Sequence, residues 1–169
     1  MPLRALTIAI CVFWSTFAQA QFATPDSQSF QRPVPARARS VIRGLVRPMH
    51  LPMDATYDQL TEEQRTFLRG YYVDMPASDD PPYPIDGLIS IFGALVSAQA
   101  KLLVTGPLSL QATVDSNGIV QSVLAVGSPS EAMTKFATSL LLVTKFKPAR
   151  CGGTACVMEF PVYVEFTTN

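Results

Sequence analysis

The chain has 169 residues, of which 48% are hydrophobic and 15% are charged. This length is typical of one domain, and the apolar fraction is high enough to form a buried core. Thirteen basic and thirteen acidic side chains cancel, so the net charge gives no reason to expect binding to nucleic acid or to an acidic substrate.

The first twenty residues have the pattern of a secretory signal peptide. Arg4 supplies a positive charge, and residues 5–18 form an uncharged, mostly apolar stretch. Ala18-Gln19-Ala20 is a small-x-small cleavage site, which predicts a mature chain that begins at Gln21. The apolar stretch is shorter than the roughly 20 residues that a membrane span needs. The alternative is an uncleaved leader that anchors the protein in a membrane.

Residues 21–56 are rich in proline and arginine and show no apolar period. Such a segment cannot bury enough surface to offset its ordering entropy, so we predict a disordered arm. The arm is either a solvated tether or an electrostatic attachment to anionic lipid, cell wall or an acidic partner.

Two helices are predicted next. Thr61 and Gln64 have capping-box spacing, which predicts a helix that begins near Thr61. A proline cluster, residues 76–84, then requires extended or turning chain. Asp86 is a candidate N-cap for a second helix over residues 86–102. Its apolar stripe favours packing on a core over a membrane surface, because Lys101 is its only basic residue.

A β-hairpin follows. Alternating apolar residues over 108–114 predict a strand with one buried face. Asp115-Ser116-Asn117-Gly118 predicts a tight turn, and the return strand covers about residues 119–126. Val120 and Val123 have opposite parity there, which indicates either two covered faces or a bulge near Gln121 and Ser122.

The third helix is predicted from Ser128-Pro129-Ser130-Glu131, a capping-box pattern with Pro129 at the first helical position. Its expected buried stripe is Met133, Phe136, Ala137, Leu140 and Leu141. A last strand is predicted over residues 157–166, where apolar residues alternate without a miss. Pro161 cannot donate a ladder hydrogen bond, which favours the edge of the sheet.

Cys151 and Cys156 remain after Cys11 leaves with the leader. An even pair in an exported chain predicts a disulfide, here across the neck of a tight turn. A metal or redox pair is the alternative, but a metal site needs about four ligands. The only histidine, His50, lies far away in the arm.

No catalytic constellation is recognisable. A Ser-His-Asp arrangement would need a histidine outside the arm, and oxidised cysteines are not nucleophiles. Asp79 and Asp80 are adjacent in a proline-rich loop, and we expect these carboxylates to be solvated. No phosphate-binding glycine motif occurs. We therefore expect a protein that is not an enzyme and that uses no cofactor, metal or small-molecule substrate.

The expected fold is α+β: a ββαβ unit with a three-stranded antiparallel sheet, helices on one face, and one or two extra helices before it. From Pro82 onward this order resembles the C-terminal domain of TonB-type energy transducers. The motifs that carry the resemblance are Tyr83-Pro84, Gly106, Asp115 to Gly118, Ser128-Pro129-Ser130, Phe146-Lys147-Pro148-Ala149, Gly152-Gly153 and the final alternating strand.

The resemblance implies a periplasmic domain, over residues 57–169, that binds an extended peptide of an outer-membrane transporter or another envelope protein. The sequence departs from the family in its longer stretch before Gly106, in the cysteine pair, and in a leader that looks cleavable. Two alternatives stay open: an inner-membrane-anchored energy transducer, and a structural cell-wall protein held by the arm.

The expected binding site is the last strand. An edge strand presents N–H and C=O groups that an incoming strand can satisfy. The same edge could join two copies in a homodimer, or be protected by Pro161 and the glutamates. The candidate contact residues on the strand are Val157, Glu159, Pro161, Tyr163 and Glu165. By resemblance, Tyr83 and Pro84 flank the edge.

Overall fold

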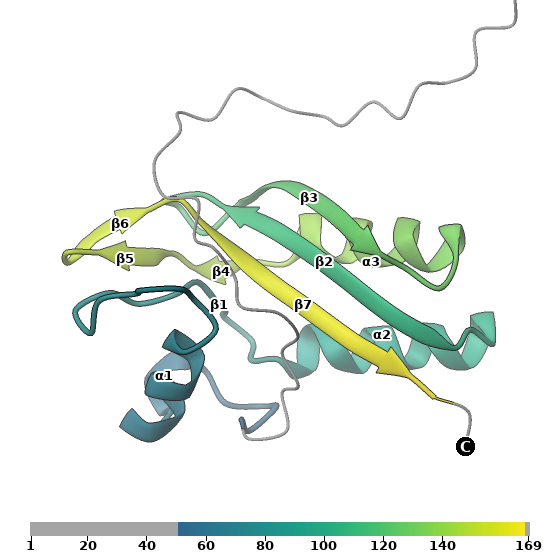
Figure 1. Cartoon of the computed structure of the whole chain (residues 1–169), viewed down its shortest axis with the longest axis horizontal. Coiled ribbons are helices and arrows are strands. Elements are labelled where there is room, and N and C mark those ends of the chain that lie inside the picture. The colour runs from purple at the N-terminus through teal and green to yellow at the C-terminus, as the bar shows by residue number, and fades with distance from the viewer. Residues whose placement is uncertain (1–50, 168–169) are drawn as a thin grey trace, which may run out of the picture.

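The computed structural model describes residues 51–167 as an α+β fold, with helices against one face of an antiparallel sheet (Figure 1). This confirms the predicted fold class. The predicted leader and most of the predicted arm lie outside the described residues. In chain order the elements are η1 (Tyr57–Gln59), α1 (Glu62–Arg69), β1 (Tyr83–Pro84), α2 (Ile89–Leu102), β2 (Gly106–Val114), β3 (Val120–Gly127), α3 (Glu131–Val143), β4 (Phe146–Lys147), β5 (Ala149–Cys151), β6 (Thr154–Cys156) and β7 (Met158–Phe166).

The main sheet has the strand order β3-β2-β7, with β2 in the centre. Alternate residues of β2 are fully buried, from Leu108 to Val114, because one face of the sheet packs against α2 and α3. The even-numbered residues of β7 continue this face, with Phe160 and Val162 in the same core. The period-two pattern of both strands therefore reflects a single covered face.

An N-terminal extension, residues 51–82, packs beside the ββαβ unit. Leu51 is only 6% exposed and belongs to the core. The carbonyl of Met53 accepts a hydrogen bond of 2.6 Å from the Ile89 N–H. The fold thus begins before residue 57, and the predicted boundary of the arm is too late. The predicted start of α1 is confirmed, because Thr61 and Gln64 form a reciprocal capping box.

Helix α2 begins later than expected. It starts at Ile89, and the backbone of Gly87 turns with φ of +75°. A Cβ on Gly87 would lie 2.9 Å from the carbonyl oxygen of Met53, so the extension approaches too closely for a larger residue. Asp86 is consequently not the N-cap.

Helix α3 has a different cap from the predicted one. Ser130 is the N-cap, and its hydroxyl accepts the N–H of Met133 at 3.1 Å. Pro129 therefore lies before the helix rather than at its first position. Met133, Ala137 and Leu141 are buried as predicted, but Phe136 is 39% exposed on the outer side of the helix.

The β2–β3 hairpin is as predicted. Asp115 Oδ1 accepts the N–H groups of Asn117 and Ile119, and Gly118 has φ of +79°. The register places Thr113 opposite Ser122 and Val114 opposite Val120, so one extra residue bulges at Gln121. A second shift occurs between Ser109 and Leu110. The bulge reading of the return strand is confirmed.

Candidate peptide-binding edge

β7 is an edge strand of the main sheet. Within residues 51–167 it pairs only with β2, through nine consecutive residue pairs without a register shift. The other edge, β3, carries two register shifts and lies against α3. Bulges protect an edge from strand addition. The long, regular edge of this sheet is therefore β7, as Pro161 predicted.

Two prolines show which main-chain groups of β7 face away from β2. Pro161 lies opposite Gln111, and Pro107 lies opposite Glu165. Proline has no N–H, so both pairs fit the class of antiparallel pairs that exchange no hydrogen bonds. We infer that residues 159, 161, 163 and 165 direct their main-chain groups away from β2, toward what is called here the outer edge.

Side chains occupy the two ends of the outer edge. The Tyr72 hydroxyl donates to the Glu159 carbonyl at 2.9 Å, and the Gln99 amide Nε2 donates to the Thr167 carbonyl at 2.9 Å. Both acceptors are carbonyls of odd-numbered residues, like Pro161, which agrees with the inference that these residues direct their main-chain groups away from β2. Tyr72 and Gln99 thus contact the outer edge at Glu159 and at Thr167, one on either side of the stretch from Pro161 to Glu165.

The predicted contact side chains of β7 share one face, opposite the helices. The Tyr163 hydroxyl donates to the Glu165 carboxylate at 2.7 Å, which shows that these two side chains are neighbours. Glu159 and Pro161 are half-buried on the same face. Val157 precedes the strand and lies outside its ladder.

Tyr83 and Pro84 lie elsewhere. They form β1, which pairs with Lys147 and Phe146 of β4 in a separate two-stranded sheet. Both are fully buried, so neither offers surface to a partner, and the implied flanking role is not supported. Burial raises the pKa of the Tyr83 hydroxyl to about 12.

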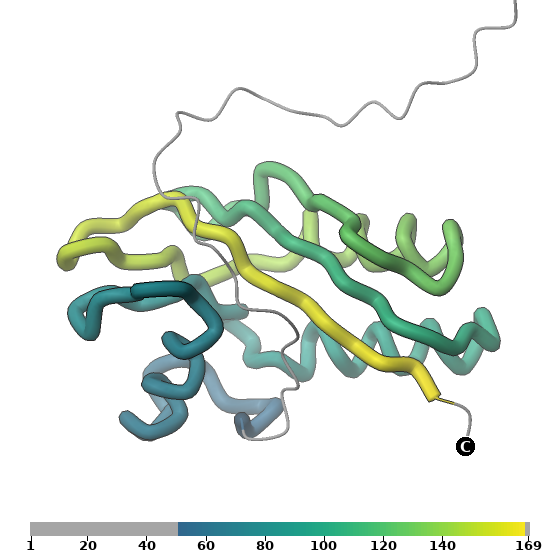
Figure 2. Tube along the Cα trace, viewed as in Figure 1, coloured from purple at the N-terminus to yellow at the C-terminus, as the bar shows by residue number. Residues whose placement is uncertain are grey.

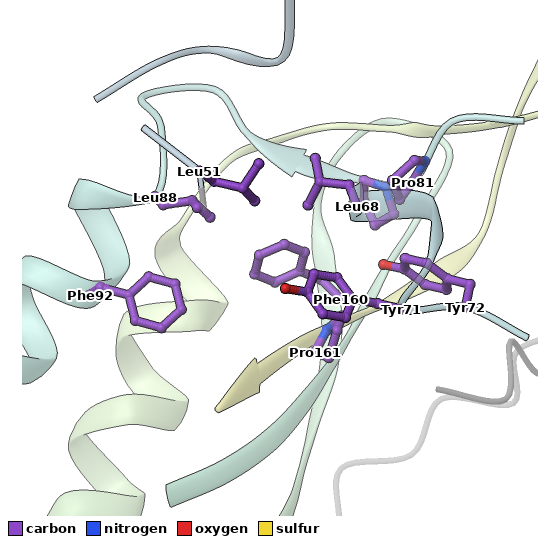
Figure 3. Close-up of a pocket in the computed structure, with 10 residues that line it drawn as sticks. Leu51, Leu68, Tyr71, Tyr72, Pro81, Leu88, Phe92, Phe160 and Pro161 are labelled. Atoms are coloured by element: carbon purple, nitrogen blue, oxygen red, sulfur yellow. The ribbon is translucent and has the colours of Figure 1, made fainter. Parts of the chain in front are cut away.

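A hollow adjoins the outer edge at Pro161. Its cavity volume is about 20 Å³, which is room for roughly one water molecule, and its lining side chains converge on one space (Figure 3). The extension supplies much of the wall, and β7 supplies Phe160 and Pro161. Sequence reasoning did not find this hollow. Its main lining residues beside β7 are Leu68, Tyr71, Tyr72 and Pro81.

The hollow is apolar and carries no ionised group at neutral pH. No Asp, Glu, Lys, Arg or His lines it. Burial raises the pKa of Tyr71 to about 12, and burial followed by the charge of Glu159 raises the pKa of Tyr72 well above its ordinary value. Both hydroxyls therefore stay neutral.

A polar cluster fixes the extension to the main unit. Asp80 accepts from the Tyr57 hydroxyl at 2.6 Å and from the Lys147 ammonium at 3.3 Å. Burial alone would raise the pKa of Asp80, but these two partners outweigh it and hold the pKa below its ordinary value. The expectation that Asp80 is solvated is wrong.

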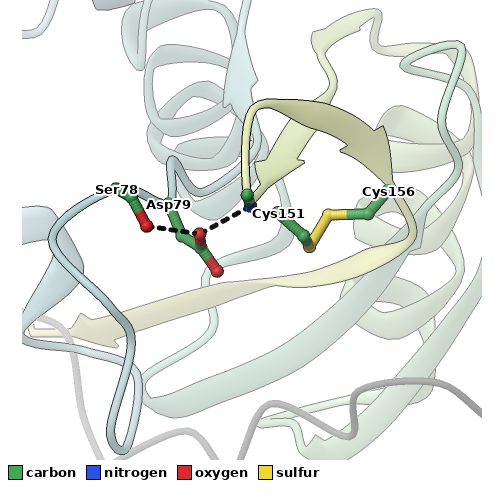
Figure 4. The surroundings of a disulfide bond; sticks show 5 residues. Ser78, Asp79, Cys151 and Cys156 are labelled. Carbon is green, nitrogen blue, oxygen red and sulfur yellow. Dashed lines mark hydrogen bonds between the residues drawn. A yellow bond between two sulfur atoms is a disulfide. The ribbon is translucent and has the colours of Figure 1, made fainter.

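The predicted disulfide is present and closes the β5–β6 hairpin between Cys151 and Cys156 (Figure 4). At the tip, the Gly152 N–H donates to the Asp79 carboxylate at 2.8 Å, and the Ser78 hydroxyl donates to the same oxygen at 3.1 Å. Asp79 and Asp80 thus have separate structural partners. The hairpin and the proline-rich loop hold one another.

The helix layer is a second surface with exposed apolar groups. Ile89 and Val96 are seven residues apart on one side of α2, and Leu103 is the residue that caps its C-terminal end. All three are exposed. Val143 on the neighbouring α3 is 77% exposed. Clustered exposed apolar groups are typical of surfaces that contact other proteins. Variants that test binding at the outer edge of β7 must therefore change residues of that edge alone.

Among residues 51–167, no group of three or more His, Cys, Asp and Glu side chains is close enough to hold a metal ion. The helices between residues 51 and 167 are too short or too polar to cross a bilayer.

The chain was compared with known proteins in three ways. No protein-family model, no curated protein and no solved structure matches it.

Proposed function

We propose that this domain binds an extended segment of another protein by strand addition along the outer edge of β7. The observation that carries the proposal is the position of β7: a nine-residue, bulge-free strand that pairs on one side only within residues 51–167. Main-chain hydrogen bonds would supply affinity, and the side chains on either side would supply specificity. The proposed activity is binding and not catalysis.

The resemblance to TonB C-terminal domains supports a choice of partner. On that basis the bound segment belongs to an outer-membrane transporter or another envelope protein, and the domain acts in the periplasm. A domain released from its leader would bind such a partner without transmitting force to it. N-terminal sequencing of the exported protein tests this point, since a first residue other than Gln21 contradicts release at that site.

The structure suggests a sharp test of strand addition. Glu165 directs its N–H toward the outer edge, so Glu165→Pro removes a donor from that edge and leaves the β2 ladder intact, as Pro161 does. Val164→Pro would instead remove an N–H that faces β2 and would damage the fold. Glu165→Gln is the matched control, because it changes the side chain and keeps the donor.

The purified protein is presented to a phage library of random short peptides, and selected peptides are titrated against each variant. We expect Glu165→Pro to weaken binding at least about tenfold, through one lost bond and the clash of its ring with the added strand. Glu165→Gln should bind within about twofold of wild type. Equal binding by wild type and Glu165→Pro contradicts strand addition on β7. If no peptide is selected and Glu165→Pro converts a wild-type dimer to a monomer, the edge serves self-association instead.

A further inference from the structure

The β5–β6 hairpin is a small unit outside the main sheet. It forms a two-stranded sheet of its own, with three residue pairs between Ala149 and Cys156. Figure 2 shows it projecting from one end of the main sheet. A two-stranded hairpin is marginally stable by itself, and the flexible Gly152-Gly153 tip adds to the entropy that ordering must overcome. The hairpin therefore depends on its cross-link and on its contacts with the rest of the chain.

The main chain of the hairpin holds the end of the proline-rich loop. The Asp80 N–H donates to the Arg150 carbonyl, and the Arg150 N–H donates to the Asp80 carbonyl, each at 2.9 Å. At the tip, the Gly152 N–H donates to the Asp79 carboxylate beside the disulfide (Figure 4). Because all three bonds use main-chain groups of β5 or the tip, they persist only while the hairpin is ordered.

A second, smaller core lies at the hairpin and is separate from the main core. Its buried members are Tyr72, Ala149 and Met158, and the side chains packed against them include Met75, Cys151 and Cys156. The main core instead contains the buried residues of α2, α3 and β2. The disulfide packs on the small core, so loss of the cross-link acts on the hairpin and the loop and not on the packing of the helices against the main sheet.

The disulfide lies at an open end of the molecule. Cys151 and Cys156 are each partly exposed, and the four residues between them are exposed. A Cβ on Gly152 or Gly153 would meet no atom within 4 Å. Thiol–disulfide exchange requires that the attacking thiolate reach one of the two sulfurs. The tip is therefore a side from which a reductant can approach the folded protein.

We propose that the Cys151–Cys156 disulfide is a redox switch. A dithiol reduces it in the folded protein, and the reduced protein releases the hairpin and residues 73–80 while the main core stays folded. This switch does not depend on strand addition at β7.

The reductant belongs to the dithiol class, such as a protein with a Cys-x-x-Cys pair. Its first thiolate attacks one cysteine sulfur and forms a mixed disulfide, which expels the other cysteine. Its second thiolate then attacks the mixed disulfide and expels the first cysteine. Two electrons and two protons pass to Cys151 and Cys156, which become thiols, and the dithiol becomes a disulfide.

Amide hydrogen exchange of the full chain, measured by NMR with and without dithiothreitol, tests the release. We expect the amides of Asp80, Arg150 and Gly152 to exchange at least about tenfold faster after reduction, because the hairpin loses its cross-link. The amides of β2 should remain protected. Alkylation of the folded, reduced protein followed by mass spectrometry should show both Cys151 and Cys156 as thiols.

Two variants serve as controls. Cys151→Ser/Cys156→Ser should show the fast pattern with or without dithiothreitol, and it keeps Cys11, so it reports any effect of the reagent there. Asp79→Ala removes the acceptor of the Gly152 N–H and keeps the disulfide. It should speed exchange at Gly152 alone and leave the Arg150 amide slow.

Three results would overturn the switch. Thiols that appear only after addition of urea would show that a dithiol does not reach the disulfide in the folded protein. Unchanged exchange at Asp80, Arg150 and Gly152 after reduction would show that the disulfide does not hold the hairpin. Loss of protection in β2 together with these amides would show that the disulfide stabilises the whole fold and not this unit.

Discussion

The hydroxyl of Tyr72 donates a 2.9 Å hydrogen bond to the main-chain carbonyl of Glu159, 87 residues later in the chain. Tyr72 is 5% exposed, and its ring packs with Ala149 and Met158. One side chain thus closes one end of the outer edge of β7 and forms part of the wall of the hollow. The stability of the extension and the geometry of the candidate site depend on the same bond.

Tyr72→Phe is expected to lower the free energy of unfolding by about 1 kcal/mol, because it keeps the ring and leaves the Glu159 carbonyl without this donor. Urea unfolding followed by circular dichroism measures the change. Tyr163→Phe is the comparison, since its hydroxyl bonds the exposed carboxylate of Glu165 and should contribute much less. Equal losses for both variants would contradict the role given to Tyr72.

Among the glycines of residues 51–167, Gly118 is the one where a side chain would be tolerated least. A Cβ there would lie 1.9 Å from the carbonyl oxygen of Phe146, and φ is +79°. Gly118→Ala is therefore expected to destabilise the domain by about 3 kcal/mol. Gly153→Ala is the control, because φ is +84° but no atom lies within 4 Å of its Cβ, and about 1 kcal/mol is expected. Thermal unfolding of the two variants separates the clash from the φ penalty, and similar melting temperatures would contradict the clash.

Local signals were sufficient to predict the order of the three α-helices and of the three strands of the main sheet, and the edge position of β7. The alternation over residues 158–166, the Asn117-Gly118 turn and the Thr61 cap each act within a few residues. Pro161 indicated the edge because a residue without an N–H cannot donate a hydrogen bond to a neighbouring strand, whatever the sheet. The cap of α3 was misassigned because Ser128 has an acidic residue three positions later, whereas Ser130, the true cap, is followed at that spacing by Met133.

Long-range contacts could not be predicted from the sequence. The pairing of β1 with β4 involves two residues on each strand, which is too short for any period to appear. The hollow is lined by residues of the extension, α2 and β7. The amino-acid types at these positions are the same as those of an ordinary core, so the sequence does not distinguish the two. The flanking role expected for Tyr83 came from the resemblance alone. Its burial depends on long-range packing, which the sequence does not show.

The disulfide is expected to stabilise the fold by about 2 kcal/mol, the chain-entropy estimate for so short a loop. The Cys151→Ser/Cys156→Ser double variant should lower the urea midpoint accordingly and leave the β2–β7 ladder folded. Dithiothreitol should lower wild type to the same midpoint and have no effect on the double variant. An effect of dithiothreitol on the variant would show that the loss of stability has another cause.

Asp80 makes stability depend on acid pH. Its pKa in the folded protein is lowered, because the Tyr57 hydroxyl and the Lys147 ammonium favour the carboxylate despite partial burial. The folded state therefore binds the proton less readily than the unfolded chain. The contribution of Asp80 is fully present above the ordinary pKa of 3.8, and it is lost as the pH falls through the folded-state value.

Asp80→Asn should therefore reduce stability at pH 6 and make little difference once the pH is low enough to protonate the wild-type carboxyl. Urea midpoints measured between these limits should converge for the two proteins as the pH falls. Asp54→Asn, at an exposed position, controls for the loss of one negative charge and should give parallel curves. Midpoints that stay equally far apart at every pH would show that Asp80 acts through its shape rather than its charge. In that case the Lys147 contact could be replaced without loss, and Lys147→Met should leave the acid branch of the stability curve unchanged.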